Sequence, residues 1–225
     1  MTNHFDICPI VVLIGGNGSN LQAIMDHPEH KRSYQVVGVI SHRNGAYGLV
    51  RAKAQGLAYQ VIDHSAYPEP HAFEAALISA IKNYAPQLIV LAGFMRILSP
   101  DFVQHFPNQI LNIHPSLLPK YKGLNTHQRV LAAKEKEHGV SVHFVTPELD
   151  SGPLIAQVTV PVFSEDNIAT LTERVHQAEH WLYPQVIAWF AHQRLKASSE
   201  IIFDNKPLGP QGVQLSLPSV KGILS

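Results

Sequence analysis

The sequence predicts an α/β fold built around a doubly wound, mostly parallel sheet. Apolar runs rich in Val, Ile and Leu alternate with helix-like stretches through the first half of the 225-residue chain. These runs lack the strict polar alternation of half-exposed strands, so both of their faces should be covered. Strands that alternate with helices in this way form parallel sheets with right-handed crossovers. In the second half, longer strands precede a single long helix.

In the first half, strands are expected at 8–15, 34–41, 57–63, 87–93 and 109–115. The helices between them are expected at 19–28, 46–55, 71–84 and, as a short one, 99–105. Each helix would carry the chain back across one face of the sheet to start the next parallel strand.

In the second half, the runs 139–146 and 154–162 predict longer strands on either side of the turn PELDSGP. A long helix should follow, because apolar residues recur there at spacings of three and four: Ile168, Leu171, Val175, Ala178, Leu182, Val186 and Trp189. Pro184 is expected to kink this helix or to separate two helices. Residues 193–203 predict a short strand or hairpin. The tail from Asp204, with three prolines and three glycines, is expected to be irregular.

Charge and composition argue against several kinds of partner. The 17 basic residues balance the 17 acidic ones, so no general attraction to nucleic acid or to an anionic membrane is expected. Any anion site must therefore be local. Cys8 is the only cysteine, which excludes an intramolecular disulfide and fits a reducing compartment. The first segment has no basic n-region and only a short apolar run, so we expect a cytoplasmic protein.

The loop IGGNGSN, residues 14–20, follows the first expected strand and opens the first helix. Backbone N–H groups and the helix dipole favour a phosphate at such a place. Ser19 or Asn20 is expected to cap the helix, to bind the phosphate, or to do both. The third glycine of the dinucleotide fingerprint is missing, since Leu21 occupies its position. We therefore interpret the loop as a monophosphate site; a purely structural βα turn is the alternative.

The motif NIHPSLLPKYKG, residues 112–123, places an amide and an imidazole two residues apart at the end of an apolar run. In a strand, residues i and i+2 share a face. Asn112 and His114 should then converge at the carboxyl end of the sheet, where open α/β sheets bind ligands. Two donors at such a point suit a carbonyl oxygen that becomes negative during a reaction. The structural alternatives are that Asn112 satisfies backbone groups and that His114 caps the sheet edge.

Asp150 stands in the turn after the strand that is expected to end at Thr146. It should lie at the same edge as His114 if the strands 139–146 and 109–113 are neighbours. A carboxylate close to a histidine favours the protonated imidazole near neutral pH. The alternative for Asp150 is an Asx-turn ahead of Gly152.

Five motifs together resemble one known family. In chain order they are GNGSN, VLAGFMRILSP (90–100), NIHPSLLPKYKG, HGVSVHFVTPELDSGP (138–153) and QAEHWLYP (177–184). They look like those of the phosphoribosylglycinamide formyltransferases, folate-dependent enzymes of purine synthesis, and the resemblance extends from about residue 9 to 195. It implies one formyltransferase domain of Rossmann-like fold over 1–203, followed by an irregular tail at 204–225. The half at about 1–110 would bind the nucleotide phosphate, and the half at about 111–203 would be catalytic and folate-binding.

The resemblance implies formyl transfer from 10-formyltetrahydrofolate, as co-substrate, to the amine of glycinamide ribonucleotide, without a metal. It assigns catalytic roles to Asn112, His114 and Asp150. Asn112 and protonated His114 would stabilise the oxyanion, while Asp150 would support the proton on His114 and order a relaying water. The expected partners are the small-molecule substrates. Binding to nucleic acid or to a membrane is not expected. Both a monomer and a homodimer are left open.

The resemblance also implies binding residues. The phosphate would contact Gly18, Ser19 and Asn20, and the rest of the nucleotide His176, Gln177, Ala178 and Glu179. The folate would lie along Met95, Arg96, Ile97 and Leu98 and along the loop formed by Thr146, Pro147, Glu148, Leu149 and Asp150. The alternative for Glu179 is an exposed helix carboxylate, and that for Arg96 is a structural ion pair.

Three departures from the family pattern concern mainly the folate side. Asn125 replaces a common histidine ahead of Thr126 and His127, no arginine precedes the helix expected at 71–84, and Pro147 replaces a frequent acidic residue. Methionyl-tRNA formyltransferase, a rival, carries a further RNA-binding domain, and formyltetrahydrofolate deformylase carries a regulatory domain at its N-terminus; neither is expected here. From other classes, a nucleotide-binding module remains an alternative, whereas the missing third glycine disfavours a Rossmann oxidoreductase.

Overall fold

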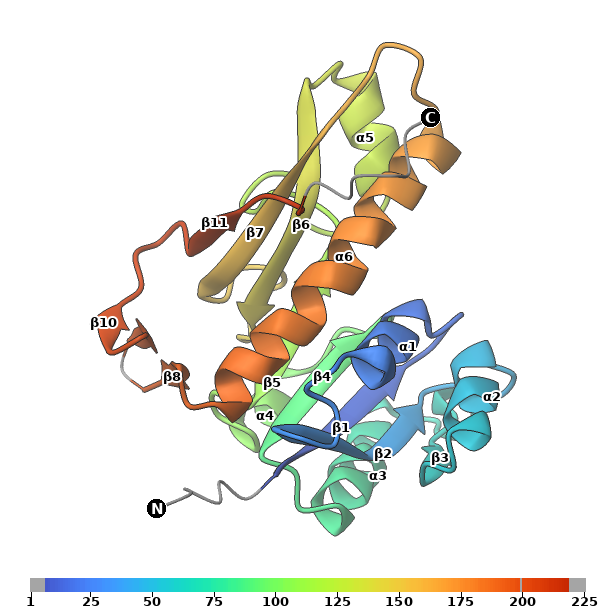
Figure 1. Cartoon of the computed structure of the whole chain (residues 1–225). Helices are drawn as coiled ribbons and strands as arrows, with labels where there is room; N and C mark the ends of the chain where they lie inside the picture. The colour runs from blue at the N-terminus through green and yellow to red at the C-terminus, as the bar shows by residue number, and fades with distance from the viewer. Residues whose placement is uncertain (1–6, 199, 219–225) are drawn as a thin grey trace.

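The computed structural model describes residues 7–198 and 200–218. An eight-stranded sheet runs through the molecule in the order β11-β7-β6-β5-β4-β1-β2-β3, and a separate small sheet has the order β10-β9-β8. Helices pack on both faces of the large sheet, and the long helix α6 crosses it diagonally (Figure 1). The α/β fold with a mostly parallel sheet, as predicted, is confirmed.

The first half of the chain follows the predicted order closely. Its strands are β1 (Cys8–Ile14), β2 (Tyr34–Ser41), β3 (Tyr59–Val61), β4 (Leu88–Ala92) and β5 (Ile110–His114). Its helices are α1 (Ser19–Asp26), α2 (Tyr47–Ala54), α3 (Pro70–Asn83) and α4 (Pro100–Gln104). All neighbouring strands among β1 to β5 pair in parallel.

The second half adds antiparallel strands. β6 (Glu137–Phe144) pairs antiparallel with both β5 and β7 (Leu154–Pro161). The short helix α5 (Thr126–Ala132), which precedes β6, was not predicted.

Helix α6 (Ile168–Ala191) is continuous, so the predicted alternative of two helices separated at Pro184 is wrong. Proline removes one helical hydrogen bond. Here, however, Pro184 is buried between two buried neighbours on the sheet-facing side, Tyr183 and Val186. Packing on both sides of Pro184 holds the helix together, as tertiary contacts generally stabilise helices in proteins.

Two hydrophobic layers enclose the sheet. In β1, Val12 belongs to the layer under α1 and α6, whereas Val11 belongs to the layer under α3 and α4. This alternation puts apolar side chains on both faces, which explains the unbroken apolar runs in the sequence. The buried Tyr183 hydroxyl donates to the carbonyl oxygens of Leu91 (2.9 Å) and Leu111 (3.0 Å), which fixes α6 against β4 and β5.

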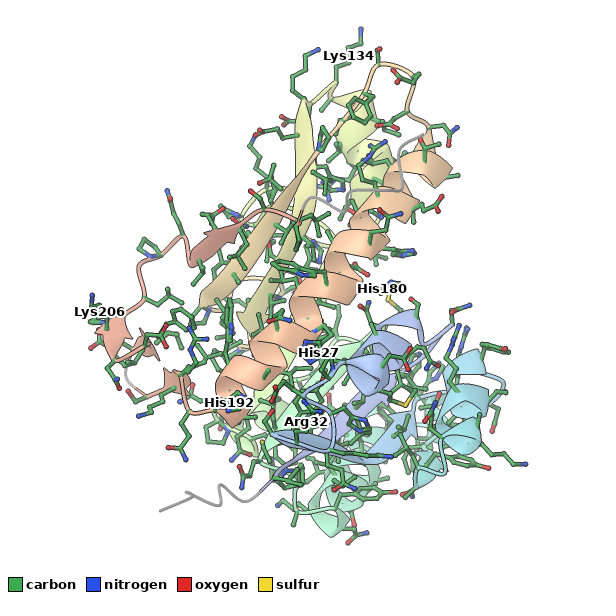
Figure 2. All side chains as sticks on the ribbon, in the orientation of Figure 1. His27, Arg32, Lys134, His180, His192 and Lys206 are labelled. Atoms are coloured by element: carbon green, nitrogen blue, oxygen red, sulfur yellow. The ribbon has the colours of Figure 1, made fainter. Side chains whose placement is uncertain are left out.

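Helix α6 also packs along α1. Figure 2 labels His192, just after the carboxyl end of α6, and His27, just after α1. His192 Nε2 lies 2.9 Å from Glu29 Oε2, and Gln185 Nε2 lies 2.8 Å from His27 Nε2. The relative position of the two helices is therefore set by polar contacts as well as by apolar packing.

The predicted hairpin at 193–203 is present as β8 (Leu195–Ala197) and β9 (Ile201–Phe203). The tail from Asp204 is not wholly irregular, contrary to the prediction. It contains β10 (Lys206–Pro207) and β11 (Val213–Leu215), which pairs in parallel with β7. Such short strands carry no recognisable period, and β11 forms because the outer edge of β7 offers backbone groups to pair with. The last part of that tail, 219–225, lies outside the described residues.

No helix in the described part of the chain is long and apolar enough to span a bilayer.

Candidate active site

The order of the sheet brings the sequence motifs to one edge. β4 pairs in parallel with β1 on one side and with β5 on the other, so the carboxyl ends of the three strands are neighbours. The glycine loop follows β1, the segment 93–99 follows β4, and His114 is the last residue of β5. This is where open α/β sheets bind ligands.

The two ring nitrogens of the buried His114 have different partners. Nε2 lies 2.9 Å from the Tyr121 carbonyl oxygen, which can only accept, so Nε2 carries the proton of the neutral ring. Nδ1 lies 3.4 Å from Asp150 Oδ2 and would carry the second proton of the imidazolium. Since 3.4 Å exceeds the usual length of a hydrogen bond, a proton on Nδ1 is not locked onto the carboxylate. His114 thus has one nitrogen that donates to the backbone and a second that faces the Asp150 carboxylate.

Asp150 approaches His114 from a returning turn. β5 and β6 are neighbours, as required, but they run antiparallel, and the end of β6 at Phe144 lies opposite Leu111. The turn after β6 therefore has to fold back to His114, and Asp150 itself adopts a positive φ of 48°. Its Oδ2 accepts a hydrogen bond of 2.8 Å from the backbone N–H of Gly123. That long-range contact, rather than an Asx-turn, positions the carboxylate.

The loop after β5 supplies backbone groups to both side chains, and Arg129 of α5 braces it. The Arg129 guanidinium donates to the carbonyl oxygens of Lys122 (2.6 Å) and Leu124 (3.4 Å) and lies 5.2 Å from the Tyr121 ring centroid. Asn125, at the start of α5, has φ 57°. Asparagine adopts this left-handed conformation more readily than most residues, so Asn125 is compatible with the backbone here.

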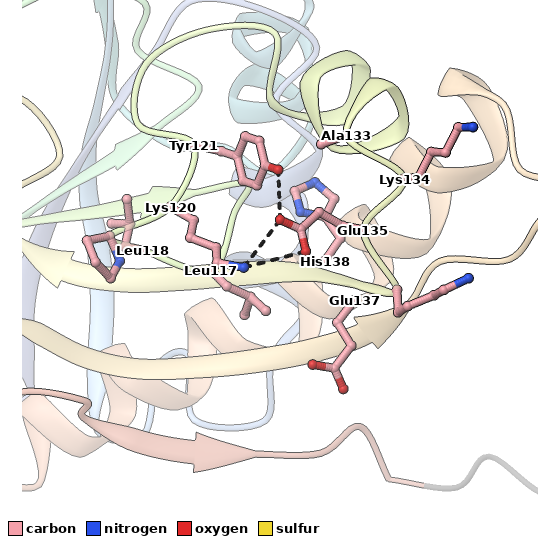
Figure 3. Close-up of a pocket in the computed structure, with 11 residues that line it drawn as sticks. Leu117, Leu118, Lys120, Tyr121, Ala133, Lys134, Glu135, Glu137 and His138 are labelled. Carbon is pink, nitrogen blue, oxygen red and sulfur yellow. Dashed lines mark hydrogen bonds and ion pairs between the residues drawn. The ribbon is translucent and has the colours of Figure 1, made fainter.

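A cavity of about 600 Å³ lies beside the same loop, between residues 117–121 and residues 133–138 (Figure 3). At its wall, Glu135 accepts hydrogen bonds from the Tyr121 hydroxyl (2.9 Å) and from Lys120 Nζ (3.2 Å). The bond from Tyr121, with help from Lys120, lowers the pKa of Glu135. These contacts fix the residue whose carbonyl group holds His114.

The segment that leaves β5 is anchored by a buried polar network. Ser141 Oγ donates to Ser116 O (2.6 Å) and accepts from Leu118 N (3.0 Å) and from Gln157 Nε2 (2.8 Å). Gln157 Nε2 also donates to Leu118 O at 2.9 Å. Buried networks in which polar groups find partners rigidify their surroundings, so the peptide just after His114 is held in place.

His143 is a site residue that sequence reasoning missed. It stands opposite Asn112 in the β5–β6 register and is only 2% exposed. Its Nδ1 lies 2.9 Å from Phe144 O, so Nδ1 carries the proton and Nε2 accepts from Asn112 Nδ2 at 3.2 Å. Burial lowers the pKa of His143, which favours this neutral form. One Asn112 N–H is thereby held and the other is left for a ligand. The available sequence signal is a histidine within an apolar strand.

At the glycine loop, the expected cap by Ser19 or Asn20 is wrong. The N-cap residue of α1 is Gly18, with φ 76° and no capping side chain, and Ser19 is already helical. Gly18 turns the chain into the helix by itself and packs closely on α2, where a Cβ atom on it would lie 2.5 Å from Gly48 Cα. The first N–H groups of α1 have no side-chain cap and can face an anion.

Glu179 of α6 lies beside the glycine loop. It is 6% exposed, and its Oε2 accepts a hydrogen bond of 2.9 Å from Asn20 Nδ2, so it is not an exposed helix carboxylate. Burial raises the pKa of Glu179, while the bond from Asn20 and the charge of His176 act in the opposite direction. His176 and Gln177 are exposed, whereas Ala178 is packed in the core. Two of the residues predicted to bind the nucleotide, Asn20 and Glu179, are therefore in contact. The Ala178 side chain is instead packed in the hydrophobic core.

The predicted folate segments flank β5. After β4, Met95 and Ile97 are 65% and 77% exposed, while Leu98 is buried. After β6, Leu149 is also exposed. Exposed apolar side chains on both sides of a strand end suit the walls of a site for a flat, largely apolar ligand. Among the described residues, Arg96 enters no ion pair, so the structural alternative for it lacks support.

No group of three or more potential metal ligands occurs among the residues that the structure describes.

Comparisons with known proteins show to which family the chain belongs. The formyl transferase family model matches residues 8–187. Phosphoribosylglycinamide formyltransferase of Escherichia coli (strain K12) is 52% identical over 205 residues, covering 90% of this chain and 97% of that protein. The Haemophilus influenzae protein of the same name is 43% identical over 206 residues, with the same coverage. The solved structure of phosphoribosylglycinamide formyltransferase from Coxiella burnetii superimposes with a TM-score of 0.89 at 49% identity, covering 93% of this chain and all of that one. The chain therefore belongs to the phosphoribosylglycinamide formyltransferase family of formyl transferases.

Proposed function

We propose that the protein transfers the formyl group of 10-formyltetrahydrofolate to the amine of glycinamide ribonucleotide, a step of purine synthesis. One observation supports this most directly: His114 Nδ1 lies 3.4 Å from Asp150 Oδ2 at the end of the strand that carries Asn112. A donor amide, a histidine and a carboxylate at one sheet edge suit acyl transfer through an oxyanion. The relatives that match over nearly their whole length carry the name of this activity.

In the proposed reaction, the neutral amine of the ribonucleotide attacks the formyl carbon, and the carbonyl oxygen becomes negative. The Asn112 N–H that His143 leaves free and the Nδ1–H of protonated His114 donate to this oxyanion. Collapse of the tetrahedral intermediate breaks the bond between the formyl carbon and N10 of the folate. A water ordered by Asp150 relays the amine proton to the departing nitrogen. The loss of one such oxyanion donor typically costs about 10²–10³ in kcat.

The substrates would lie on the two sides of this centre. The ribonucleotide phosphate would bind at Gly18 and Ser19, mainly through the open N–H groups of α1. Glu179, one oxygen of which is held by Asn20, would accept hydrogen bonds from the ribose hydroxyls through the other. His176 and Gln177 are exposed and able to reach the nucleotide.

The folate would lie between residues 95–98 and the loop 146–150, and the mechanism requires no metal. We place the reaction in the cytoplasm, where the single cysteine of the chain would stay reduced.

The test is to mix the protein with glycinamide ribonucleotide and 10-formyltetrahydrofolate and to follow the folate absorbance. We expect turnover that depends on the ribonucleotide and yields its N-formyl product. Equal turnover with water alone would instead identify a deformylase. If neither reaction occurs but the ribonucleotide binds, the chain is a nucleotide-binding module. The His114→Asn variant is the control: it should bind the ribonucleotide and fail to turn over.

A further inference from the structure

The glycine loop is held from the side by an arginine of helix α2. Arg51 Nε donates to the Asn17 carbonyl oxygen at 3.0 Å, and Nη2 donates to Asn17 Oδ1 at 2.9 Å. Its third nitrogen, Nη1, donates to Gln22 Oε1 on α1 at 3.3 Å. One planar guanidinium thus joins the loop, α1 and α2 with all three of its nitrogens.

Further contacts fix the position of this side chain. The guanidinium carbon of Arg51 lies 5.0 Å from the centroid of the Tyr47 ring, one turn earlier in α2. Arg51 Cδ lies 3.5 Å from the position that a Cβ atom on Gly18 would occupy. The residue therefore packs against the very peptide that turns the chain into α1.

The charge of Arg51 has no carboxylate partner among the residues that the structure describes. All three of its hydrogen-bond acceptors are neutral amide oxygens. The chain as a whole has a formal net charge of zero, so an anion site needs a local cation. The first turn of α1 contains no basic residue, and Arg51 supplies a full positive charge beside it.

We propose that Arg51 is a positioning residue that shapes the glycine loop for a phosphate monoester and raises the affinity for it. This rests on the proposed function, in which the loop receives the ribonucleotide phosphate. Arg51 acts through Asn17 and the loop backbone, which it holds in the conformation that directs N–H groups at the anion. Its unneutralised charge adds attraction at short range.

Lysine cannot replace this arginine fully. Its ammonium group keeps the charge, but it is a compact point charge without the planar fork that spans the Asn17 and Gln22 acceptors. Arg51→Lys should therefore keep part of the contribution of Arg51 to phosphate affinity, whereas Arg51→Met should lose all of it. Lys53→Met is the matched control, because it removes one positive charge from an exposed position of the same helix.

The experiment measures the binding of ribose 5-phosphate by calorimetry and of glycinamide ribonucleotide by kinetics. We expect Arg51→Met to weaken ribose 5-phosphate binding about tenfold, the lower end of the effect of losing hydrogen bonds made by a charged group. Arg51→Lys should be intermediate, and Lys53→Met should stay within about twofold of the wild type. In turnover, the KM for the ribonucleotide should rise while kcat and the KM for the folate stay close to wild type.

Two outcomes would overturn the proposal. One is that Arg51→Met lowers the melting temperature but leaves phosphate binding as it is in Lys53→Met, which would make Arg51 a purely structural tie. The other is that Arg51→Met weakens the binding of glycinamide riboside, which lacks the phosphate, by the same factor as the binding of the ribonucleotide. Because ribose 5-phosphate binding needs no formyl transfer, failure of the proposed reaction would be recognised separately in the wild-type assay. If Arg51→Met does not fold, Arg51→Lys supplies the same comparison.

Discussion

The imidazole of His114 faces the carboxylate of Asp150 across 3.4 Å, and one backbone loop makes hydrogen bonds to both groups. Tyr121 O accepts from His114 Nε2, and Gly123 N donates to Asp150 Oδ2. The loop that follows β5 therefore sets the distance between the proposed acid and its supporting carboxylate. Movement of this loop would change both groups together.

The first prediction concerns Asp150→Asn. The amide keeps the size of the side chain but removes the negative charge that lies beside His114 and would order the relaying water, so kcat should fall by about a hundredfold or more. Steady-state kinetics measure this loss, and ribonucleotide binding serves as the control that should not change. A kcat close to the wild-type value would mean that Asp150 has no catalytic role.

The second prediction concerns His143, which orients the Asn112 amide. His143→Phe removes the acceptor for Asn112 Nδ2 and leaves the amide free to rotate, which should cost about 1 kcal/mol of transition-state stabilisation, or roughly five- to tenfold in kcat. His143→Gln retains an acceptor and should recover part of the loss. Values of kcat and KM for the two variants provide the test. Equal losses in both, or an effect on KM alone, would contradict the assigned role.

The difference between Asn112 and His143 shows which parts of the site the sequence could predict. Asn112 and His114 lie two residues apart on one strand, so the strand period alone predicts that they share a face. The position of His143 depends on the register between β5 and β6, which places it opposite Asn112. That register is a tertiary relationship, and in the sequence His143 is only a polar residue in an apolar run.

The same distinction holds for the fold. Strands β1, β2, β4 and β5 were predictable because both of their faces are covered, which leaves a strong apolar pattern. Helix α5 was missed because it has only seven residues and its N-cap residue, Asn125, makes no side-chain cap hydrogen bond. Strand β11 was missed because it exists only through its pairing with β7. Short elements take their conformation from neighbours, and their own residues carry little signal.

The third prediction uses two glycines of the same loop. Gly18 has φ 76°, and a Cβ atom on it would lie 2.5 Å from Gly48 Cα, so Gly18→Ala strains the backbone and forces α1 and α2 apart. We expect a loss of stability of about 1–3 kcal/mol and a raised KM for the ribonucleotide. Gly16→Ala is the matched control for stability, because a Cβ atom there would meet nothing within 4 Å. Thermal unfolding of both variants measures the difference, and equal melting temperatures would argue against the close approach of the two helices.

The fourth prediction concerns stability at low pH. Burial, with smaller contributions from the nearby His127 and His114, lowers the pKa of His138 from 6.5 to about 4, and its Nε2 lies 3.0 Å from His127 Nδ1. The unfolded chain therefore takes up a proton at His138 below about pH 6.5, whereas the folded chain takes it up only near pH 4. The free energy of unfolding should fall across that window, by at most about 3.5 kcal/mol at about 1.4 kcal/mol per pKa unit.

Urea unfolding of the wild type and of His138→Gln at pH 7.5, 5.5 and 4.5 measures this loss. His138→Gln removes the titrating group, so its stability should decline less steeply between the first and last pH values, whatever its stability at pH 7.5. His105→Gln changes an exposed histidine and should keep the wild-type slope. If His138→Gln and His105→Gln lose stability in parallel as the pH falls, the buried neutral His138 is not what limits the stability of the fold in acid.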